Sequence, residues 1–136
     1  MKPDKLLVIR DNIHATGSLR DRCIFELFMS GLSHGEIASA RAPNYTDKFK
    51  KLKMIGSETQ VIISPEAKFL IRAYVRDNKI TPGEYLFKKS ATAPLSILDI
   101  YFLWREWLCE ICIYDFQITP ERIEQIVRLY RASQKV

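Results

Sequence analysis

The sequence predicts a mainly helical α+β fold that carries one small antiparallel sheet. Apolar residues recur at helical spacing in several separate stretches, and capping residues stand in front of most of them. Between the first and the second long helix lies a short stretch in which β-forming residues flank a turn that contains glycine. These observations place a hairpin among helices.

The length of 136 residues is that of one domain, with room for one hydrophobic core. We therefore expect a single domain over residues 1–136, in which residues 1–17 form an N-terminal extension. The apolar run at residues 6–9 predicts a short strand or a linker remnant that packs on the domain. This run is too short for a signal peptide.

The stretch from residue 23 to residue 41 combines a helix, a break and a second short helix. Gly31 can end the first helix in a left-handed conformation. Ser33 can cap the second helix, and Glu36 completes a capping box with it. In front of this stretch, Gly17 and Ser18 predict a turn and a cap. The apolar stripe of the first helix consists of Ile24, Leu27, Phe28, Gly31 and Leu32.

The central stretch predicts two strands around a turn at Gly56. Lysines alternate with apolar residues over residues 45–53, and residues 59–63 are strongly β-forming. Ser64 then caps a helix that has Pro65 in its first turn and runs to Asn78.

Two further helices follow a turn at residues 81–84 and an extended piece at residues 85–87. Ser96 and Asp99 form a second capping box, in front of a helix that runs to about Tyr114. Thr119 caps the last helix, which ends near Ser133.

The helix after Ser96 is apolar on nearly all sides. Its apolar run, residues 95–116, contains five charged residues, a density that is costly in a bilayer, so we interpret it as a core helix and expect no membrane span. A chain of this length cannot bury such a helix by itself. We therefore expect the Trp104 and Trp107 region to contact a second copy of the chain or a partner protein.

Charge and cysteine content narrow the classes of function. A formal net charge of +5 favours a polyanionic partner such as nucleic acid. Three cysteines without a secretory signal indicate reduced thiols and a cytoplasmic location. Cys109 and Cys112 form a Cys-x-x-Cys pair inside an apolar run, with no second pair to complete a zinc site, so we interpret them as buried helix residues. No metal and no cofactor is expected.

The segment from Gly31 to Arg41 resembles the box of tyrosine recombinases, the phage-integrase family, that carries their first catalytic arginine. The residues Gly31-Leu32-Ser33-His34-Gly35-Glu36-Ile37 follow that pattern, but Ser33 stands where the family has the arginine. The resemblance implies a three-stranded antiparallel sheet at the central stretch. It also implies that Lys53, or Lys51 if the register slips, corresponds to the lysine that the family carries on its hairpin.

The remaining catalytic groups of the family have no counterpart. Aligned on Thr119-Pro120, the positions of the family's histidine and second arginine hold Glu121 and Glu124. Tyr130 follows too soon to match the nucleophile, and the chain stops before the nucleophile's place. Because a ring of cations stabilises the negative phosphate during strand cleavage, carboxylates there are of the wrong charge. The resemblance therefore implies a degenerate, truncated scaffold and a protein that is not an enzyme.

Such a scaffold is expected to bind double-stranded DNA, as a nucleoid-associated regulator of transcription or of a plasmid or other mobile element. Phosphate contacts would come from lysines, and base contacts from the helix that begins after Ser96. The expected DNA-binding residues are Arg41, Lys48, Lys50, Lys51, Lys53, Lys88, Lys89, Ser96 and Arg105.

Two other interpretations remain open. In the first, the chain is a protein interaction module or a regulatory subunit that no longer touches DNA, a role that fits Glu121 and Glu124. In the second, residues 31–40 begin a helix-turn-helix, although Pro43 breaks the chain where its recognition helix would run.

Overall fold

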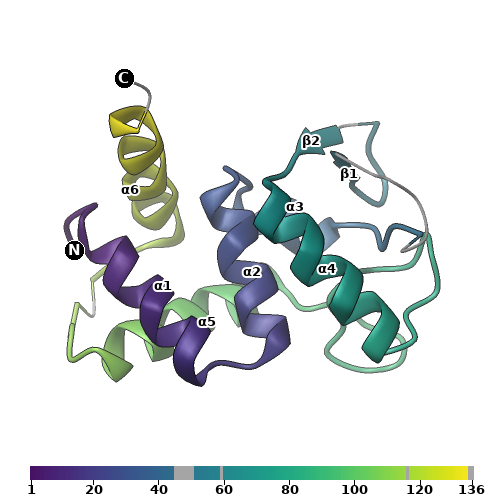
Figure 1. Cartoon of the computed structure of the whole chain (residues 1–136), viewed down its shortest axis with the longest axis horizontal. Coiled ribbons are helices and arrows are strands. Elements are labelled where there is room, and N and C mark those ends of the chain that lie inside the picture. The colour runs from purple at the N-terminus through teal and green to yellow at the C-terminus, as the bar shows by residue number, and fades with distance from the viewer. Residues whose placement is uncertain (45–50, 59, 116, 135–136) are drawn as a thin grey trace.

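A computed structural model gives the arrangement of residues 1–44, 51–58, 60–115 and 117–134. Within these residues the chain is mainly helical, with one two-stranded antiparallel sheet. The strands lie at one end of the molecule, and α1 and α6 lie at the other (Figure 1). The elements are α1 (Lys5–Thr16), α2 (Leu19–Met29), α3 (His34–Ser39), β1 (Lys51–Lys53), β2 (Gln60–Ile62), α4 (Pro65–Asp77), α5 (Ile97–Glu110) and α6 (Pro120–Ser133).

Helices α2 to α6 all begin at a serine or threonine cap. In each case the hydroxyl accepts a hydrogen bond from the backbone N–H three residues later, which satisfies one of the free donors at the helix start. The two predicted capping boxes, Ser33 with Glu36 and Ser96 with Asp99, are confirmed. Gly31 adopts the predicted left-handed conformation, with φ of +99°.

The N-terminal segment is a helix, so the expectation of a strand or linker there is wrong. Leu6, Ile9 and Ile13 are three and four residues apart and therefore share one face of α1. Each is at most 1% exposed, because α1 packs against α2 and α5. Burial of this stripe explains why residues that favour strands elsewhere form a helix here.

In the part of the chain that the structure describes, the sheet has two strands and not the three that the family resemblance implies. In the sheet, β1 pairs antiparallel with β2, and Leu52 lies opposite Val61. Residues 39–42, here called the bridging segment, lie beside the sheet and join their neighbours only through isolated bridges. Pro43 follows it and has no N–H to donate to a longer ladder.

The bridging segment is nevertheless hydrogen-bonded along both of its edges. On one edge, the Arg41 N–H donates to the Lys53 carbonyl, and the Ile55 N–H donates to the Ser39 carbonyl, both at 2.7 Å. On the other edge, the Ala42 N–H donates at 2.7 Å to the carbonyl of Glu84. An extended segment thus follows α3, where a helix-turn-helix would need its recognition helix, so that interpretation is wrong.

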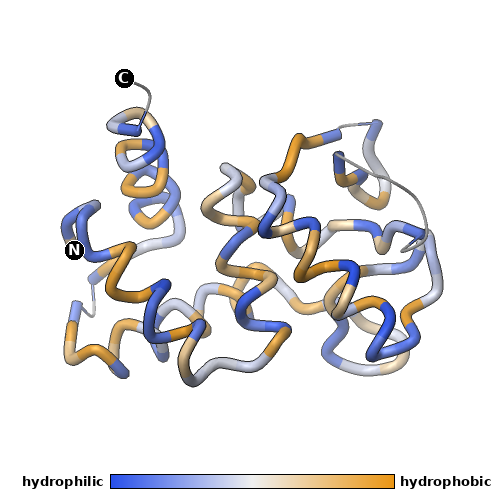
Figure 2. The backbone as a smooth tube through the Cα atoms, in the orientation of Figure 1, coloured by the Kyte–Doolittle hydropathy of each residue, from blue (hydrophilic) through white to orange (hydrophobic). Residues whose placement is uncertain are grey.

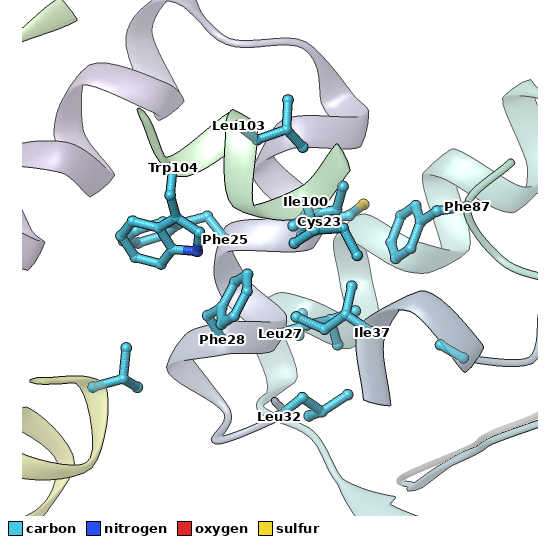
Figure 3. Close-up of a cluster of buried hydrophobic side chains, with 14 of the residues drawn as sticks. Cys23, Phe25, Leu27, Phe28, Leu32, Ile37, Phe87, Ile100, Leu103 and Trp104 are labelled. Atoms are coloured by element: carbon cyan, nitrogen blue, oxygen red, sulfur yellow. The ribbon is translucent and has the colours of Figure 1, made fainter. Parts of the chain in front are cut away.

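The core lies between α2, α3 and α5 (Figure 3). The ring centroid of Trp104 is 5.6 Å from that of Phe25 and 5.1 Å from that of Phe28. Trp107 packs edge-on against Phe25 at 5.8 Å. Both tryptophans are at most 2% exposed, so these two side chains are not themselves available to a partner. They instead fill the core that this chain forms by itself.

Helix α4 and helix α6 are amphipathic and cover this core. Their turns alternate between hydrophobic and hydrophilic residues in Figure 2. The buried face of α4 consists of Ala67, Ile71 and Val75. The buried face of α6 consists of Ile123, Ile126 and Val127.

Helix α5 ends at Glu110, one turn before the predicted end at Tyr114. Cys112 has φ of +60°, a left-handed conformation that a helix cannot continue. As a result both Cys109 and Cys112 are exposed, and the expectation that they are buried is wrong. No helix of the described residues is both long and apolar enough to cross a membrane.

Candidate nucleic-acid interface

Three of the expected DNA-binding residues surround one hollow beside the hairpin. The hollow has a volume of about 220 Å³ and is lined by Arg41, Lys51 and Lys53, together with residues 42–44 and Leu52. Lys48 and Lys50 lie outside the described residues. One cationic group therefore comes from the bridging segment and two come from β1.

The strand geometry of β1 explains why its two lysines lie on the same side. Successive side chains of a strand point to opposite faces, so Lys51 and Lys53 share the face opposite Leu52. Leu52 is 1% exposed and anchors the strand in the core, while both lysines are exposed. This alternation places the two ammonium groups at the solvent side of the hollow.

Arg41 is half-buried and leaves one donor without an acceptor. Its Nε atom is buried and has no hydrogen-bond partner in the described structure. A buried polar group that lacks a partner costs free energy, on the order of 1–3 kcal/mol for a neutral donor and more for a charged one. Arg41 also lines the hollow, so its guanidinium group lies beside any anion seated there.

Lys88 and Lys89 lie in the loop before α5, and each is paired with a carboxylate. Lys88 Nζ forms an ion pair with Glu84, and Lys89 Nζ lies 3.7 Å from Asp99 Oδ1. Lys88 and Ile55 line a second hollow. Because Ile55 belongs to the turn of the hairpin, Lys88 also lies beside the hairpin. Lys89 instead borders the first turn of α5. Because both pairs are partly exposed, water screens them and a phosphate can replace the carboxylate.

Ser96 and Asp99 are occupied in capping α5. The Ser96 hydroxyl accepts a hydrogen bond from the Asp99 N–H at 3.0 Å, and the Asp99 carboxylate accepts one from the Ser96 N–H at 2.9 Å. This backbone hydrogen bond, aided by nearby Lys89, lowers the pKa of Asp99. The first turn of α5 therefore carries a fixed negative charge, which repels phosphate.

Arg105 does not line the hollow beside the hairpin. It lies nine residues after Ser96, which corresponds to about 14 Å along the helix axis. Its side chain is half-buried on α5. The structure thus gathers Arg41, Lys51 and Lys53, with Lys88 nearby, and it separates Ser96 and Arg105 from them.

Ser33 and Glu124, two positions that correspond to catalytic residues in the resemblance, lie close together although they are far apart in sequence. The backbone N–H of His34, next to Ser33, donates to Glu124 Oε1 at 2.9 Å. This contact joins the start of α3 to α6. A carboxylate of α6 therefore accepts from one of the backbone donors at the start of α3.

His34 is a buried histidine in contact with that carboxylate. Its side chain is 2% exposed, it packs edge-on against Phe28 at 4.7 Å, and its Nδ1 lies 3.6 Å from Glu124 Oε1. Burial lowers the pKa of His34, and the charges of Glu124 and Glu121 oppose this shift only in part. The imidazole is therefore neutral at pH 7.

The structure contains a buried ion cluster between α1 and α2 that the sequence analysis does not predict. Arg10 donates to both carboxylate oxygens of Glu26, at 2.7 and 3.2 Å, and His14 Nε2 lies 3.0 Å from Glu26 Oε1. The Glu26 side chain is 2% exposed. Because the sequence predicts no helix in residues 1–17, it does not reveal that Arg10 and His14 lie one turn apart on the same face.

The described residues contain no cluster of three or more histidine, cysteine or acidic side chains that could hold a metal ion. Of the cysteines, Cys23 is buried, and burial raises the pKa of its thiol to about 12, which makes it a poor nucleophile.

Comparison with known protein families, with curated proteins and with solved structures found no match to this chain.

Proposed function

We propose that this chain binds double-stranded DNA without cutting it, on a scaffold similar to the catalytic domain of tyrosine recombinases. The observation that carries the proposal is the hollow beside the hairpin, with Arg41, Lys51 and Lys53 around it. A backbone phosphate in this hollow would lie beside the guanidinium group of Arg41 and could form a charge-assisted contact with it. Both lysines would then contact the phosphate backbone from the exposed face of β1.

The proposed DNA face extends from the hairpin to Lys88. Binding would exchange the ion pair of Lys88 with Glu84 for a contact with phosphate. We leave Ser96 and Arg105 out of this face, because the first turn of α5 carries the ionised Asp99 and Arg105 lies two to three turns further on. Phosphate contacts supply affinity that depends strongly on salt, and they carry little sequence information.

The proposal that the chain does not cut DNA is supported by the groups at the start of α3. Glu124 accepts a hydrogen bond from the His34 N–H, and Glu121 adds a second carboxylate nearby. Two carboxylates repel the charge that develops on a phosphate during cleavage. A DNA-bound, non-cutting protein of this kind would act in the cytoplasm on the nucleoid, as a regulator of transcription or of a plasmid or other mobile element.

The direct test is titration of a labelled duplex with the wild type and with the variant Lys51→Glu/Lys53→Glu, followed by fluorescence anisotropy over a range of salt concentrations. We expect the variant to bind at least about tenfold more weakly at low salt, which is a loss of about 1.4 kcal/mol. The slope of log K against log salt should fall by roughly 0.9 for each phosphate contact removed.

The matched control is Lys2→Glu/Lys5→Glu, which makes the same change in net charge at exposed residues near the N-terminus. This control should keep both the affinity and the salt slope of the wild type, apart from a small uniform loss. Equal binding by the wild type and the hairpin variant would rule out the hairpin as the DNA contact. A covalent protein–DNA species would contradict the absence of cleavage.

A second candidate function is that of a protein interaction module that does not touch DNA. It is favoured by the carboxylates of Glu121 and Glu124 and by the acidic partners that already neutralise Lys88 and Lys89. Two results together would support this function. The chain would retain a partner protein at high salt, and the wild type and the hairpin variant would bind the duplex equally.

A further inference from the structure

Two outward-facing helix surfaces are left unused by the proposed DNA face. The first is on α4, and it centres on Phe69, whose exposure of 73% is the highest of any large apolar side chain in the described residues. Phe69 lines a hollow of about 350 Å³ together with Lys68, Arg72 and Arg76. These three cations recur every four residues, so they form one stripe beside the phenyl ring.

The second surface is on α5, and it has the opposite charge. Leu98 and Phe102 are 58% and 47% exposed, and they are followed at the same four-residue spacing by the exposed Glu106 and Glu110. Phe102 also lines a hollow of about 230 Å³. This stripe therefore begins with apolar side chains and ends with carboxylates.

The two surfaces match in both order and length. On α4, Phe69 precedes Arg76 by seven residues, or about 10 Å along the helix. On α5, Leu98 precedes Glu106 by eight residues, or about 12 Å. If the two helices lie parallel, the phenyl ring of Phe69 reaches the apolar half of the α5 stripe while Arg76 reaches its acidic half.

We propose that the α4 surface of one copy of this chain binds the α5 surface of a second copy. Phe69 acts as the anchor by packing against the exposed Leu98 and Phe102, since a buried aromatic side chain contributes more to binding than the surrounding contacts. Arg76 of α4 pairs with Glu106, which fixes the direction of the contact. Glu110 already accepts a hydrogen bond from Asn12 Nδ2 at 2.7 Å and adds only its negative charge to this end of the stripe.

The charges around the α5 hollow permit this contact. Arg20 and Lys89 also line the hollow, but each is already paired, Arg20 with Asp21 at 3.1 Å and Lys89 with Asp99 at 3.7 Å. On α4, Arg76 pairs with its neighbour Asp77, and both side chains are more than half exposed. An exposed pair of this kind contributes little, so Arg76 can exchange it for a carboxylate of the second copy.

The contact joins two different patches, so it is heterologous. After two copies pair, the α5 surface of one copy and the α4 surface of the other are still unused. Further copies can therefore add until a ring closes. This self-association does not require DNA. It can therefore fail or succeed independently of the proposed DNA binding.

The test is sedimentation velocity without DNA, over a concentration series, on the wild type and on Phe69→Ser, Arg76→Glu and Glu106→Arg. The wild type should associate reversibly, and each variant should raise the apparent dissociation constant by more than about tenfold. All three residues are exposed on helices, so circular dichroism and thermal melts should stay close to those of the wild type. The controls Lys2→Glu and Glu58→Arg, at exposed sites off both surfaces, should associate like the wild type.

The decisive arm mixes the variant Arg76→Glu with the variant Glu106→Arg. Each variant alone places like charges in the contact. In the mixture, the unchanged α4 surface of Glu106→Arg can meet the unchanged α5 surface of Arg76→Glu. The altered α4 surface of Arg76→Glu, with its new carboxylate, can likewise meet the new guanidinium on the α5 surface of Glu106→Arg. We expect the mixture to form dimers that neither variant forms alone. A wild type that stays monomeric at its highest soluble concentration, association unaffected by Phe69→Ser, or no recovery in the mixture would each overturn the proposal.

Discussion

The imidazole of His34 is enclosed by Phe28 on one side and faces the carboxylate of Glu124 at 3.6 Å. Because burial disfavours its charged form, the pKa of His34 in the folded chain lies below the ordinary value of 6.5. The unfolded chain thus takes up this proton at a higher pH than the folded chain does. The contribution of His34 to the free energy of unfolding is therefore fully present above about pH 6.5. It is lost as the pH drops through the pKa of the folded state.

We expect the free energy of unfolding of the wild type to decrease between about pH 7 and pH 5.5, and to decrease less in His34→Gln, which cannot titrate. Urea unfolding at a series of pH values measures both slopes. The contribution of His34 should persist in His14→Gln, a matched change at the other histidine. A His34→Gln variant whose slope equals that of the wild type would contradict the assignment.

At the scale of the elements, the turn between α2 and α3 depends on a glycine and on a side chain of α6. Gly31 has φ of +99°, and a Cβ placed on it would lie 1.9 Å from Arg131 Nη1. Gly83 has a similar φ of +91°, but no atom lies within 4 Å of its Cβ position. The two glycines thus share the backbone requirement and differ in their neighbours.

We therefore expect Gly31→Ala to destabilise the protein more than Gly83→Ala does. Both substitutions cost about 1–2 kcal/mol for the left-handed backbone, and Gly31→Ala must also displace the guanidinium of Arg131. Urea unfolding of each variant measures the difference. The excess cost of Gly31→Ala should shrink when Arg131→Ala is also present, because the clash is then absent. Equal costs for the two glycine variants would show that Arg131 does not pack against the turn.

At the scale of the whole molecule, the N-terminal helix is held to the core by the buried carboxylate of Glu26. Removing one partner of a buried ion pair typically costs about 3–5 kcal/mol, because the other charge is left uncompensated. Arg10 is partly exposed, so we expect the loss in free energy of unfolding for Arg10→Met to lie near the lower end of this range, at about 3 kcal/mol. Urea unfolding measures this loss.

The control is Arg20→Met, which removes an arginine whose partner, Asp21, is its direct neighbour on the surface. Its expected cost is at most about 1 kcal/mol. The double variant Arg10→Met/Glu26→Leu should recover part of the stability lost in Arg10→Met, since the buried carboxylate that has lost its arginine is then gone. Similar costs for Arg10→Met and Arg20→Met would show that the Glu26 pair does not hold α1.

The parts of the fold that are predictable are those that local sequence determines. A capping hydroxyl and its partner lie three residues apart, so Ser33 and Ser96 mark their helices without knowledge of the tertiary structure. The N-terminal helix escapes prediction because residues 6–9 are all apolar and show no period, and only contact with α2 and α5 selects a helix. The exposure of Cys112 escapes it too, because nothing nearby in sequence announces the left-handed conformation of this residue.

The candidate site divides in the same way. Lys51 and Lys53 can be placed on one face because strand geometry is local. The closeness of His34 to Glu124 depends on how α6 docks against α3, which only the resemblance suggests. The carboxylate partners of Lys88 and Lys89 cannot be foreseen, since they depend on the path of the loop before α5.

The two hydrogen-bonded edges of the bridging segment have a consequence for how the proposed site would capture an anion. The backbone of Arg41 is tied to Lys53 on one edge and, through Ala42, to Glu84 on the other, and its Nε already lies beneath the surface. Such a guanidinium has few rotational states left to surrender on binding. Calorimetry should therefore find a smaller entropic penalty for phosphate capture than for a flexible arginine on an open loop, because the receptor is rigid before its ligand arrives.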